Sequence, residues 1–499
     1  MEKSQREEVV AKIQAERSFL GHPRGIGVLS FRYMTNSFAN YGMMAVLVYY
    51  LYAAVPGGLG LGKTDAAQLM SLFNALVILF SAVGSYMADR VFGIRGALRL
   101  NALVLPVAYI VLSIPGSGIP GYATAMGLLL FGSMISGRAL DSLTGKMYAK
   151  GDKRRDGAFA ITYVISNIGA MIPSVTGTIA LISGYHAAFA LCAVMSTLGS
   201  ILYLILERTM FGPIGSEPDD PLPPKARKMT VGMMLGIIAA VTLVLIVLFT
   251  RGILTVKSFS NMVSTVSLFI PFGYLIYILT SPKTLPEEKK HIFYLIPMFI
   301  SSSVAMLVWY QATSILSIYA ETSVNLVFFG HQVTPAIYWT LQAVFAVLFG
   351  SVVTGLWGKL GNKQPSTPAK MGIGTALYGI GTLIMVIPFQ MYAPGVKASP
   401  FWLVAVYALV IIGEAISYPA GNSAASIVAP AAFSTQMMTV WAMGLSTGAS
   451  LSTLVSNFYR EGHESGYFLA IGGVTVAVGC TVFLLSKKLA IGMGLQERK

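Results

Sequence analysis

Charged residues are scarce in this chain of 499 residues, at 11% of the sequence, whereas hydrophobic residues make up 55%. So few charges cannot cover the surface of a soluble protein of this length. The sequence therefore predicts an integral membrane protein. Its apolar runs are near 20 residues long and are interrupted by Gly and Pro, which favours α-helical spans over barrel strands of about 10 alternating residues.

Cysteine is almost absent, since the chain has only Cys192 and Cys480. Both lie in apolar runs without metal-ligand spacing, so we expect neither a disulfide framework nor a metal site. No nucleophile–base set or phosphate loop stands out, and we expect no enzymatic activity and no cofactor. The first 20 residues are charged and lack an apolar signal-peptide core, so no cleavage is expected.

Fourteen apolar windows are long enough to cross a bilayer. They lie near 26–54, 66–88, 97–115, 119–147, 158–183, 186–206, 230–250, 261–280, 292–320, 332–357, 370–390, 401–427, 433–457 and 466–486. An even number puts both termini on one side of the membrane. Of the 34 Lys and Arg residues, 27 would lie on that side and five on the other. The positive-inside rule therefore predicts cytoplasmic termini, and topology explains the net charge of +14 without a nucleic-acid partner.

The segment 207–229 is rich in proline and polar, which is typical of a linker. The two spans after it look like a hairpin, over 230–290, inserted between six-span bundles at 1–206 and 291–499. This duplicated organisation is that of a major facilitator transporter. Fourteen spans of an unrelated channel or enzyme are the alternative at this point.

The loop after the second span reads GSYMADRVFGIR, from Gly84 to Arg95. It resembles the G-x-x-x-D-R-x-x-G-R loop of major facilitators. We interpret Asp89, Arg90 and Arg95 as a cytoplasmic latch, because an Asp at a helix end can accept hydrogen bonds from a neighbouring helix and pair with arginines. The alternative is an ordinary solvated loop.

The most specific stretch is GKMYAKGDKRRDGAFAITYVISNIGA, from Gly145 to Ala170. It resembles the signature of the proton-dependent oligopeptide transporter family, and further matches such as WYQATSILSIYAE and GEAISYPAGNSAASIV extend the resemblance along nearly the whole chain. The resemblance implies an all-α major facilitator fold of fourteen transmembrane helices, with two six-helix bundles and an inserted hairpin. It also implies transport of di- or tripeptides across a bacterial cell membrane by alternating access.

The chain departs from this family at the positions associated with proton coupling. The aligned residues here are Tyr33, Asn36 and Ser37 for the E-x-x-E-R of the first span, Met44 for a later arginine, Gly137 for the lysine of the fourth span, Tyr310 for a glutamate and Ala343 for an asparagine. A buried carboxylate can carry a proton because its pKa can be moved across the working pH, whereas Tyr, Asn and Ser cannot do so near neutral pH. We therefore expect proton coupling to be altered or absent.

Three ionisable residues remain deep in the predicted spans, where each costs at least about 2.5 kcal/mol at the centre. Glu414 matches the family's glutamate that pairs with the substrate's amino group, and its alternative partners are a hydroxyl or one of the two arginines. Arg32 lies early in the first span, where it either snorkels to the cytoplasmic interface or acts as a cation toward Glu414 or an anionic solute. Arg138 either pairs with Asp141, three residues on, or replaces the missing lysine, although a one-residue shift rotates a helical side chain by about 100°.

Neutral side chains complete the predicted substrate site. Tyr163 and Asn167 match family positions, and their spacing of four puts them on one helix face, able to bond a peptide backbone. The other predicted site residues are Tyr310, Gln311, Ser417, Trp441, Tyr33 and Asn36. For each aromatic residue, simple helix packing is an equally good explanation.

We expect a monomer in the inner membrane that takes a peptide-like solute, with protons left open as a second partner. Two other functions stay open from the sequence. One is transport of another small solute, an anion attracted by Arg32 and Arg138. The other is a membrane scaffold without transport activity.

Overall fold

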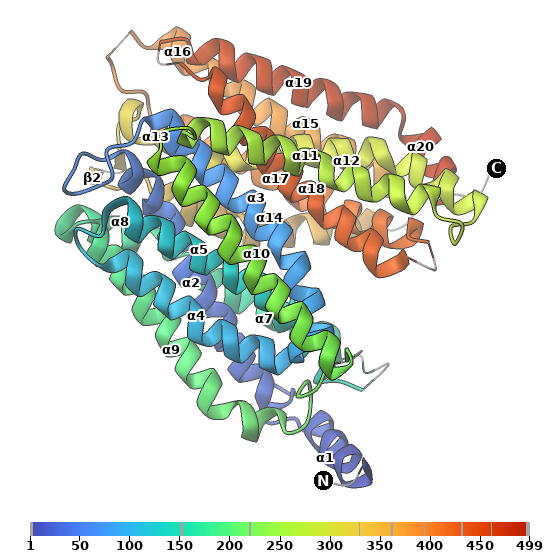
Figure 1. The fold of residues 1–499 in the computed structure, drawn as a ribbon. Helices are drawn as coiled ribbons and strands as arrows, with labels where there is room; N and C mark the ends of the chain where they lie inside the picture. Colours follow the sequence, from blue (N-terminus) through green and yellow to red (C-terminus); the bar gives the residue numbers. More distant parts are fainter. Residues whose placement is uncertain are drawn as a thin grey trace. The chain divides into compact units, whose positions relative to one another are not determined.

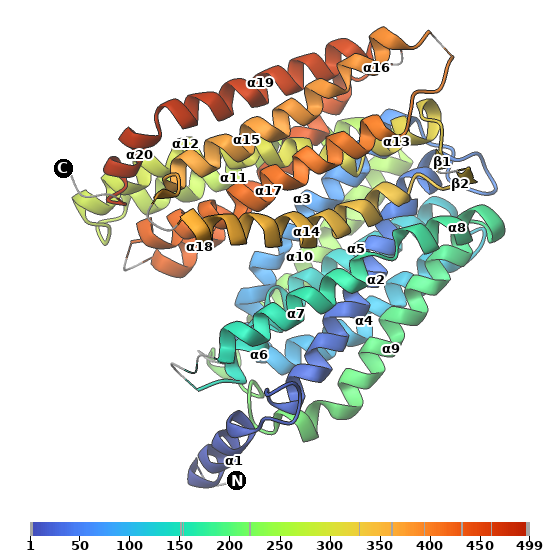
Figure 2. The ribbon, with the colours of Figure 1, turned by 180° about the vertical axis from the view of Figure 1, so that it is seen from behind.

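The computed structural model describes residues 3–149, 152, 154–218, 221–328, 330–360, 363–393, 395–430, 433–460 and 462–495. Long helices make up nearly all of the described chain (Figures 1 and 2). Its β structure is one antiparallel pair of two-residue strands, β1 (Val327–Phe328) and β2 (His331–Gln332).

The helices of the first half are α1 (Lys3–Ala15), α2 (Arg24–Tyr52), α3 (Lys63–Met87) with a π-helical turn (Ala88–Phe92), α4 (Ile94–Ser113), α5 (Gly118–Ser136), α6 (Ala139–Lys146), α7 (Arg154–Ala170), α8 (Pro173–Ser183), α9 (Tyr185–Phe211) and α10 (Pro224–Thr250). Those of the second half are α11 (Val256–Thr280), α12 (Pro286–Ala312), α13 (Ile315–Ser323), α14 (Ile337–Leu360), α15 (Thr367–Ile384), α16 (Val386–Met391), α17 (Phe401–Val428), α18 (Ser434–Val455), α19 (Glu464–Leu484) and α20 (Ser486–Gly492).

Twelve helices of the described chain, with consecutive pieces joined, are long and apolar enough to cross a membrane. Two more helices have spanning length, α2 with 29 residues and α18 with 22. The all-α membrane fold is confirmed, and these helices match the fourteen windows predicted from apolar runs.

Internal contacts divide the chain into two compact units. The first unit holds residues 1–50, 54–59 and 79–259, and the second holds 51–53, 60–78 and 260–499. Helix α10 therefore belongs to the first unit, and α11 belongs to the second from Ser260 on. The predicted boundaries of the two bundles, the linker and the inserted hairpin stay a prediction.

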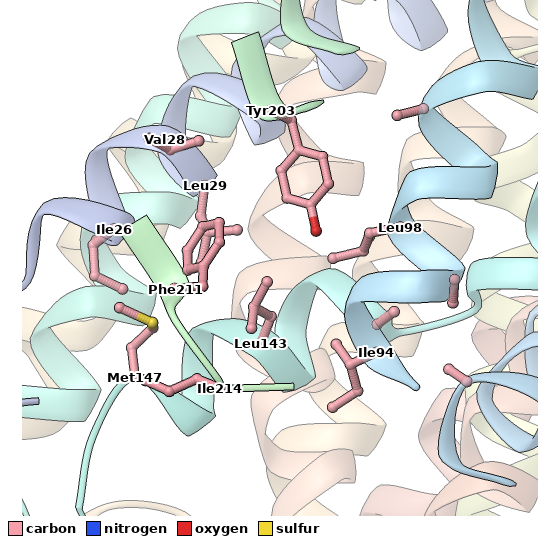
Figure 3. Close-up of a cluster of buried hydrophobic side chains, with 14 of the residues drawn as sticks. Ile26, Val28, Leu29, Ile94, Leu98, Leu143, Met147, Tyr203, Phe211 and Ile214 are labelled. Atoms are coloured by element: carbon pink, nitrogen blue, oxygen red, sulfur yellow. The ribbon is translucent and has the colours of Figure 1, made fainter. Parts of the chain in front are cut away.

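The core of the first unit joins helices that are distant in sequence. Figure 3 shows its buried side chains from α2, α4, α6 and α9 with their flanking loops: Ile26, Val28, Leu29, Ile94, Leu98, Leu143, Met147, Tyr203, Phe211 and Ile214. At Gly25 a Cβ atom would lie 2.7 Å from carbons of both Met147 and Phe211. This cluster therefore packs directly on the backbone at the start of α2.

The second unit is held together by close helix contacts around α15. A Cβ atom at Gly379 of α15 would lie 2.6 Å from the Val476 nitrogen of α19. On another face, a Cβ atom at Gly374 would lie 2.5 Å from the Gly413 oxygen of α17. Small residues permit such approaches between membrane helices, and here they fix α17, which carries Glu414.

Candidate transport site

Glu414 lies in the middle of α17, where it is half-buried. Trp309 of α12 donates its indole Nε1–H to Glu414 Oε2 at 3.1 Å. Within the described residues, this carboxylate forms no ion pair with Lys, Arg or His. Since an ionised carboxylate has about four acceptor positions, one neutral donor leaves most of its capacity for a cation or further donors.

Ser417 and Trp441 come together in the second unit, as two of the predicted site residues. Both line a small cavity of about 10 Å³, room for roughly one water molecule, together with Met306 and Met371. Ser417 donates its hydroxyl to the Gly413 carbonyl at 2.8 Å, one turn back on α17. The Trp441 indole is likewise engaged, since its Nε1–H reaches Asn422 Oδ1 at 2.9 Å.

Tyr310 and Gln311 follow Trp309 on α12 and are buried. The Tyr310 ring meets the Trp309 ring edge-on, with centroids 5.1 Å apart. Gln311 Nε2 donates to Ser452 Oγ at 2.9 Å, and its Oε1 accepts from the Tyr467 hydroxyl at 2.7 Å. Both ends of this amide therefore bind α18 and α19, and a role of Gln311 toward substrate stays a prediction.

In the first unit, Tyr33 and Arg138 converge on Asp141. The Tyr33 hydroxyl donates to Asp141 Oδ1 at 2.5 Å, and an Arg138 guanidinium nitrogen lies 3.3 Å from Asp141 Oδ2. The pairing of Arg138 with the residue three positions on is thus confirmed. The contact from Tyr33 was not predicted, because no sequence spacing relates α2 to α6.

Gly137 explains the unusual course of the fourth span. Helix α5 ends at Ser136 and α6 begins at Ala139, and between them Gly137 has φ +46°, a conformation that disfavours other residues. A Cβ atom there would lie 2.3 Å from the Ser85 nitrogen. A lysine would therefore not fit this backbone, and the expected rotation of Arg138 on an unbroken helix does not apply.

Arg32 lies in a buried polar network between helices, with 2% of its surface exposed. Its guanidinium donates to Ser200 Oγ at 2.6 Å, to Asn101 Oδ1 at 3.1 Å and to the Ser196 carbonyl at 3.4 Å. Asn101 Nδ2 continues the network to Ser136 Oγ at 3.1 Å. The snorkelling expected of Arg32 is wrong, because snorkelling requires an exposed head group.

The polar residues of α2 and α7 have local partners. Ser37 Oγ lies 2.6 Å from Ser166 Oγ of α7, and Asn36 on α2 is half-buried. Tyr163 is 57% exposed on α7, and Asn167 donates its side-chain Nδ2 to the Tyr163 carbonyl at 2.9 Å. Their predicted role toward a peptide backbone stays a prediction.

The predicted latch residues occupy two environments. Asp89 is exposed in the π-helical turn, and the Arg90 guanidinium carbon lies 5.8 Å from the Tyr86 ring centre. Arg95 is buried on α4, and its Nε lies 3.4 Å from Glu207 Oε2 of α9. The Arg95 side chain thus serves packing between α4 and α9, and the latch itself stays a prediction.

Two carboxylates inside membrane helices were missed. Glu207 is 3% exposed and pairs with Arg95 and Arg99, and Glu321 accepts a hydrogen bond from Tyr52. Sequence windows ended at 206 and 320, whereas the helical spans continue to Phe211 and Ser323. Both carboxylates lie within a few residues of the end of their helices, a part of each helix that the windows did not reach. The sequence does carry a signal for Glu207, because it directly follows the apolar run that ends at 206 and precedes Arg208, as expected where a helix continues beyond its apolar part.

Comparisons with known proteins agree on one family. The POT family profile matches residues 138–477. The chain is 34% identical to the "Uncharacterized transporter YclF" of Bacillus subtilis, covering 96% of both chains, and 31% identical to the "Di-/tripeptide transporter" of Lactococcus lactis subsp. lactis, covering 96% of this chain and 98% of that one.

Solved structures give the same result. A crystal structure of peptide transporter POT in complex with sulfate superposes with a TM-score of 0.93 at 32% identity, covering 97% of this chain and 99% of that one. A crystal structure of a POT family transporter in complex with 5-aminolevulinic acid superposes with a TM-score of 0.88 at 31% identity, covering 95% of this chain and 98% of that one. With profile, relatives and fold in agreement, this chain belongs to the POT family of multi-pass membrane transporters.

Proposed function

We propose that the protein carries di- or tripeptides, or peptide-like solutes, across the inner membrane by alternating access, with both termini in the cytoplasm. The observation that carries this proposal is the environment of Glu414, a carboxylate with one neutral donor and no cation among the described residues. The amino terminus of a peptide is an ammonium group that supplies the missing positive charge. The family assignment and the transporters among the relatives support the same substrate class.

Neutral residues would hold the rest of the substrate. We propose that Tyr163 and Asn167 bond the peptide backbone, with Asn36 as a further polar group from α2. Tyr310 and Trp441 would contribute aromatic surface for substrate side chains. Gln311 and Ser417, which already have partners within the second unit, would position these neighbours rather than take substrate.

We also propose that coupling to protons is altered or lost. Helix α2, which holds the acidic motif in the family, contains no Asp or Glu in this chain. Tyr33 in that motif instead donates to Asp141, whose other oxygen faces Arg138. Both oxygens of this half-buried carboxylate therefore already have partners, a phenol and a cation.

Flux measurements in liposomes test both parts separately. The full chain is reconstituted, and uptake of labelled dialanine is followed by counterflow and then under an imposed inward proton gradient. We expect counterflow well above empty liposomes and less than a twofold increase in accumulation from the gradient. Steep accumulation driven by protons would contradict the loss of coupling, while absence of peptide counterflow would contradict the substrate.

Transport of a small anion has weaker support. An anion would need Arg32 and Arg138 as cations without partners. Arg32 is instead buried among neutral acceptors, and Arg138 pairs with Asp141. Counterflow with 5-aminolevulinic acid and with succinate in the same liposomes separates an amino-bearing solute from a pure anion. Uptake of succinate alone would favour the anion transporter, and no uptake of any solute would favour a scaffold.

A further inference from the structure

A groove of about 740 Å³ lies at one end of the second unit, between α12 and the α19–α20 segment. Its lining combines basic, aromatic and apolar side chains, among them Lys290, His291, Tyr294, Leu484, Lys487 and Lys488. None of these residues belongs to the proposed transport site, so the groove needs a separate explanation.

The groove is shaped by close packing of the chain that ends at α20. A Cβ atom at Gly492 would lie 2.3 Å from the Tyr294 ring, so the α20 backbone rests directly on this aromatic face. Leu489, Ala490 and Met493 are buried at 3%, 0% and 1% exposure, which anchors one side of the segment in the core. Lys487 and Lys488 are exposed on the other side, and α20 is therefore an amphipathic helix fixed against α12.

Positive charge dominates the groove. Lys290, Lys487 and Lys488 line it together, against the single carboxylate of Glu287. In the described part of the chain, none of the three lysines forms an ion pair. A concave surface with three such cations attracts a phosphate group, and each lysine near a membrane surface strengthens the binding of anionic lipid.

Apolar side chains next to the lysines point to a ligand with acyl chains. The membrane-spanning part of α19 ends at Leu484, which is 80% exposed, and Phe293 on the neighbouring α12 is 65% exposed. Large apolar side chains exposed on spanning helices face lipid, whereas lysines just beyond them reach the head-group level. This order along the helices matches a phospholipid, with the lysines suited to its phosphate and Leu484 and Phe293 to its chains.

We propose that this groove is a binding site for an anionic phospholipid, with the phosphate held by Lys290, Lys487 and Lys488 and the acyl chains along Leu484 and Phe293. Tyr294, a half-buried residue of the lining, would offer its hydroxyl to the head group. The site would hold one lipid more tightly than the surrounding bilayer does.

Native mass spectrometry of the full-length transporter in detergent tests the proposal, with dioleoyl phosphatidylglycerol and phosphatidylcholine as probes. We expect one phosphatidylglycerol to bind at least tenfold more tightly than phosphatidylcholine. The triple variant Lys290→Ser/Lys487→Ser/Lys488→Ser should lose this preference, and the single variants Lys487→Ser and Lys488→Ser should each weaken it. A control with three exposed lysines of the same unit replaced outside the groove, Lys283→Ser/Lys359→Ser/Lys363→Ser, should keep it.

Two further arms separate a lipid from a soluble anion. Inorganic phosphate or glycerophosphoglycerol at the same concentration should not displace the bound lipid. The variant Leu484→Asn should weaken the binding of phosphatidylglycerol while leaving the lysines of the groove in place. Displacement by the soluble anions at equal concentration would overturn the lipid assignment. Equal binding of both lipids, or a groove variant that binds like the control variant, would overturn the site.

Discussion

Arg32 in the first unit and Glu414 in the second are charges inside membrane helices with opposite surroundings. Arg32 is 2% exposed and donates to three oxygens on α4 and α9. Glu414 is half-buried and accepts from one indole of α12. A charge whose hydrogen bonds are met by neighbouring helices stabilises the fold, whereas one with unused acceptor capacity is suited to a ligand. The comparison therefore favours a structural task for Arg32 and supports the role toward substrate that we propose for Glu414.

Replacing Arg32 tests the structural half of this comparison and should have the largest effect. Arg32→Met leaves Asn101 Oδ1 and Ser200 Oγ without their charged donor in a buried site. We expect a loss of about 3 kcal/mol in the free energy of unfolding, measured by denaturant titration in mixed micelles. The matched variant Arg138→Met removes an exposed ion pair with Asp141 and should cost at most about 1 kcal/mol. Equal losses in both variants would remove the distinction between them.

Replacing Glu414 tests the functional half. Glu414→Gln keeps the shape and an acceptor for Trp309 but removes the charge, so the free energy of unfolding should change by less than about 1 kcal/mol. Dipeptide counterflow should fall about 10- to 100-fold, because a charged hydrogen bond to the substrate contributes about 1.5–3 kcal/mol. Glu464→Gln, at the start of α19, is the control for a carboxylate outside the site and should transport normally. Full counterflow by Glu414→Gln would mean that Glu414, like Arg32, is structural.

Tyr33 lies next to Arg32 on α2 and sharpens the comparison within one helix. Tyr33→Phe removes the hydroxyl that donates to Asp141 but leaves the ion pair of Asp141 with Arg138. We expect a loss of about 1 kcal/mol in stability and less than a twofold change in counterflow between pH 6 and pH 7.5. A counterflow that acquires or loses a steep pH dependence in this variant would show that Asp141 carries protons after all.

The sequence predicts contacts between residues close in the chain better than contacts between helices. The pair Arg138–Asp141 follows from a spacing of three, and the fourteen windows follow from apolar length. The acceptors of Arg32 lie 69 to 168 residues away, on helices whose facing sides no periodicity identifies. The break at Gly137 was equally hidden, because glycine is common in membrane helices and only φ +46° distinguishes this one.

His22, just before α2, is a further buried titratable group and gives the smallest expected effect. Its Nδ1 lies 2.7 Å from the Tyr148 hydroxyl, and burial, followed by the nearby Arg154, lowers the pKa of His22 below its usual 6.5, against a smaller opposite effect of Asp152. The unfolded chain therefore binds a proton at His22 more readily than the folded one.

This sign predicts stability that is complete above pH 6.5 and declines as the pH falls through the lowered pKa of the folded state. The wild-type protein should lose unfolding free energy between pH 7.5 and pH 5.5, and His22→Gln should make this loss smaller, by less than about 1 kcal/mol. The control His331→Gln, at an exposed position on β2, should leave the loss unchanged. A wild-type stability that rises on acidification over this range, with the rise abolished in His22→Gln, would require a stabilising charge on His22. In that case His22 would resemble Glu414, a charge kept for a partner, rather than Arg32.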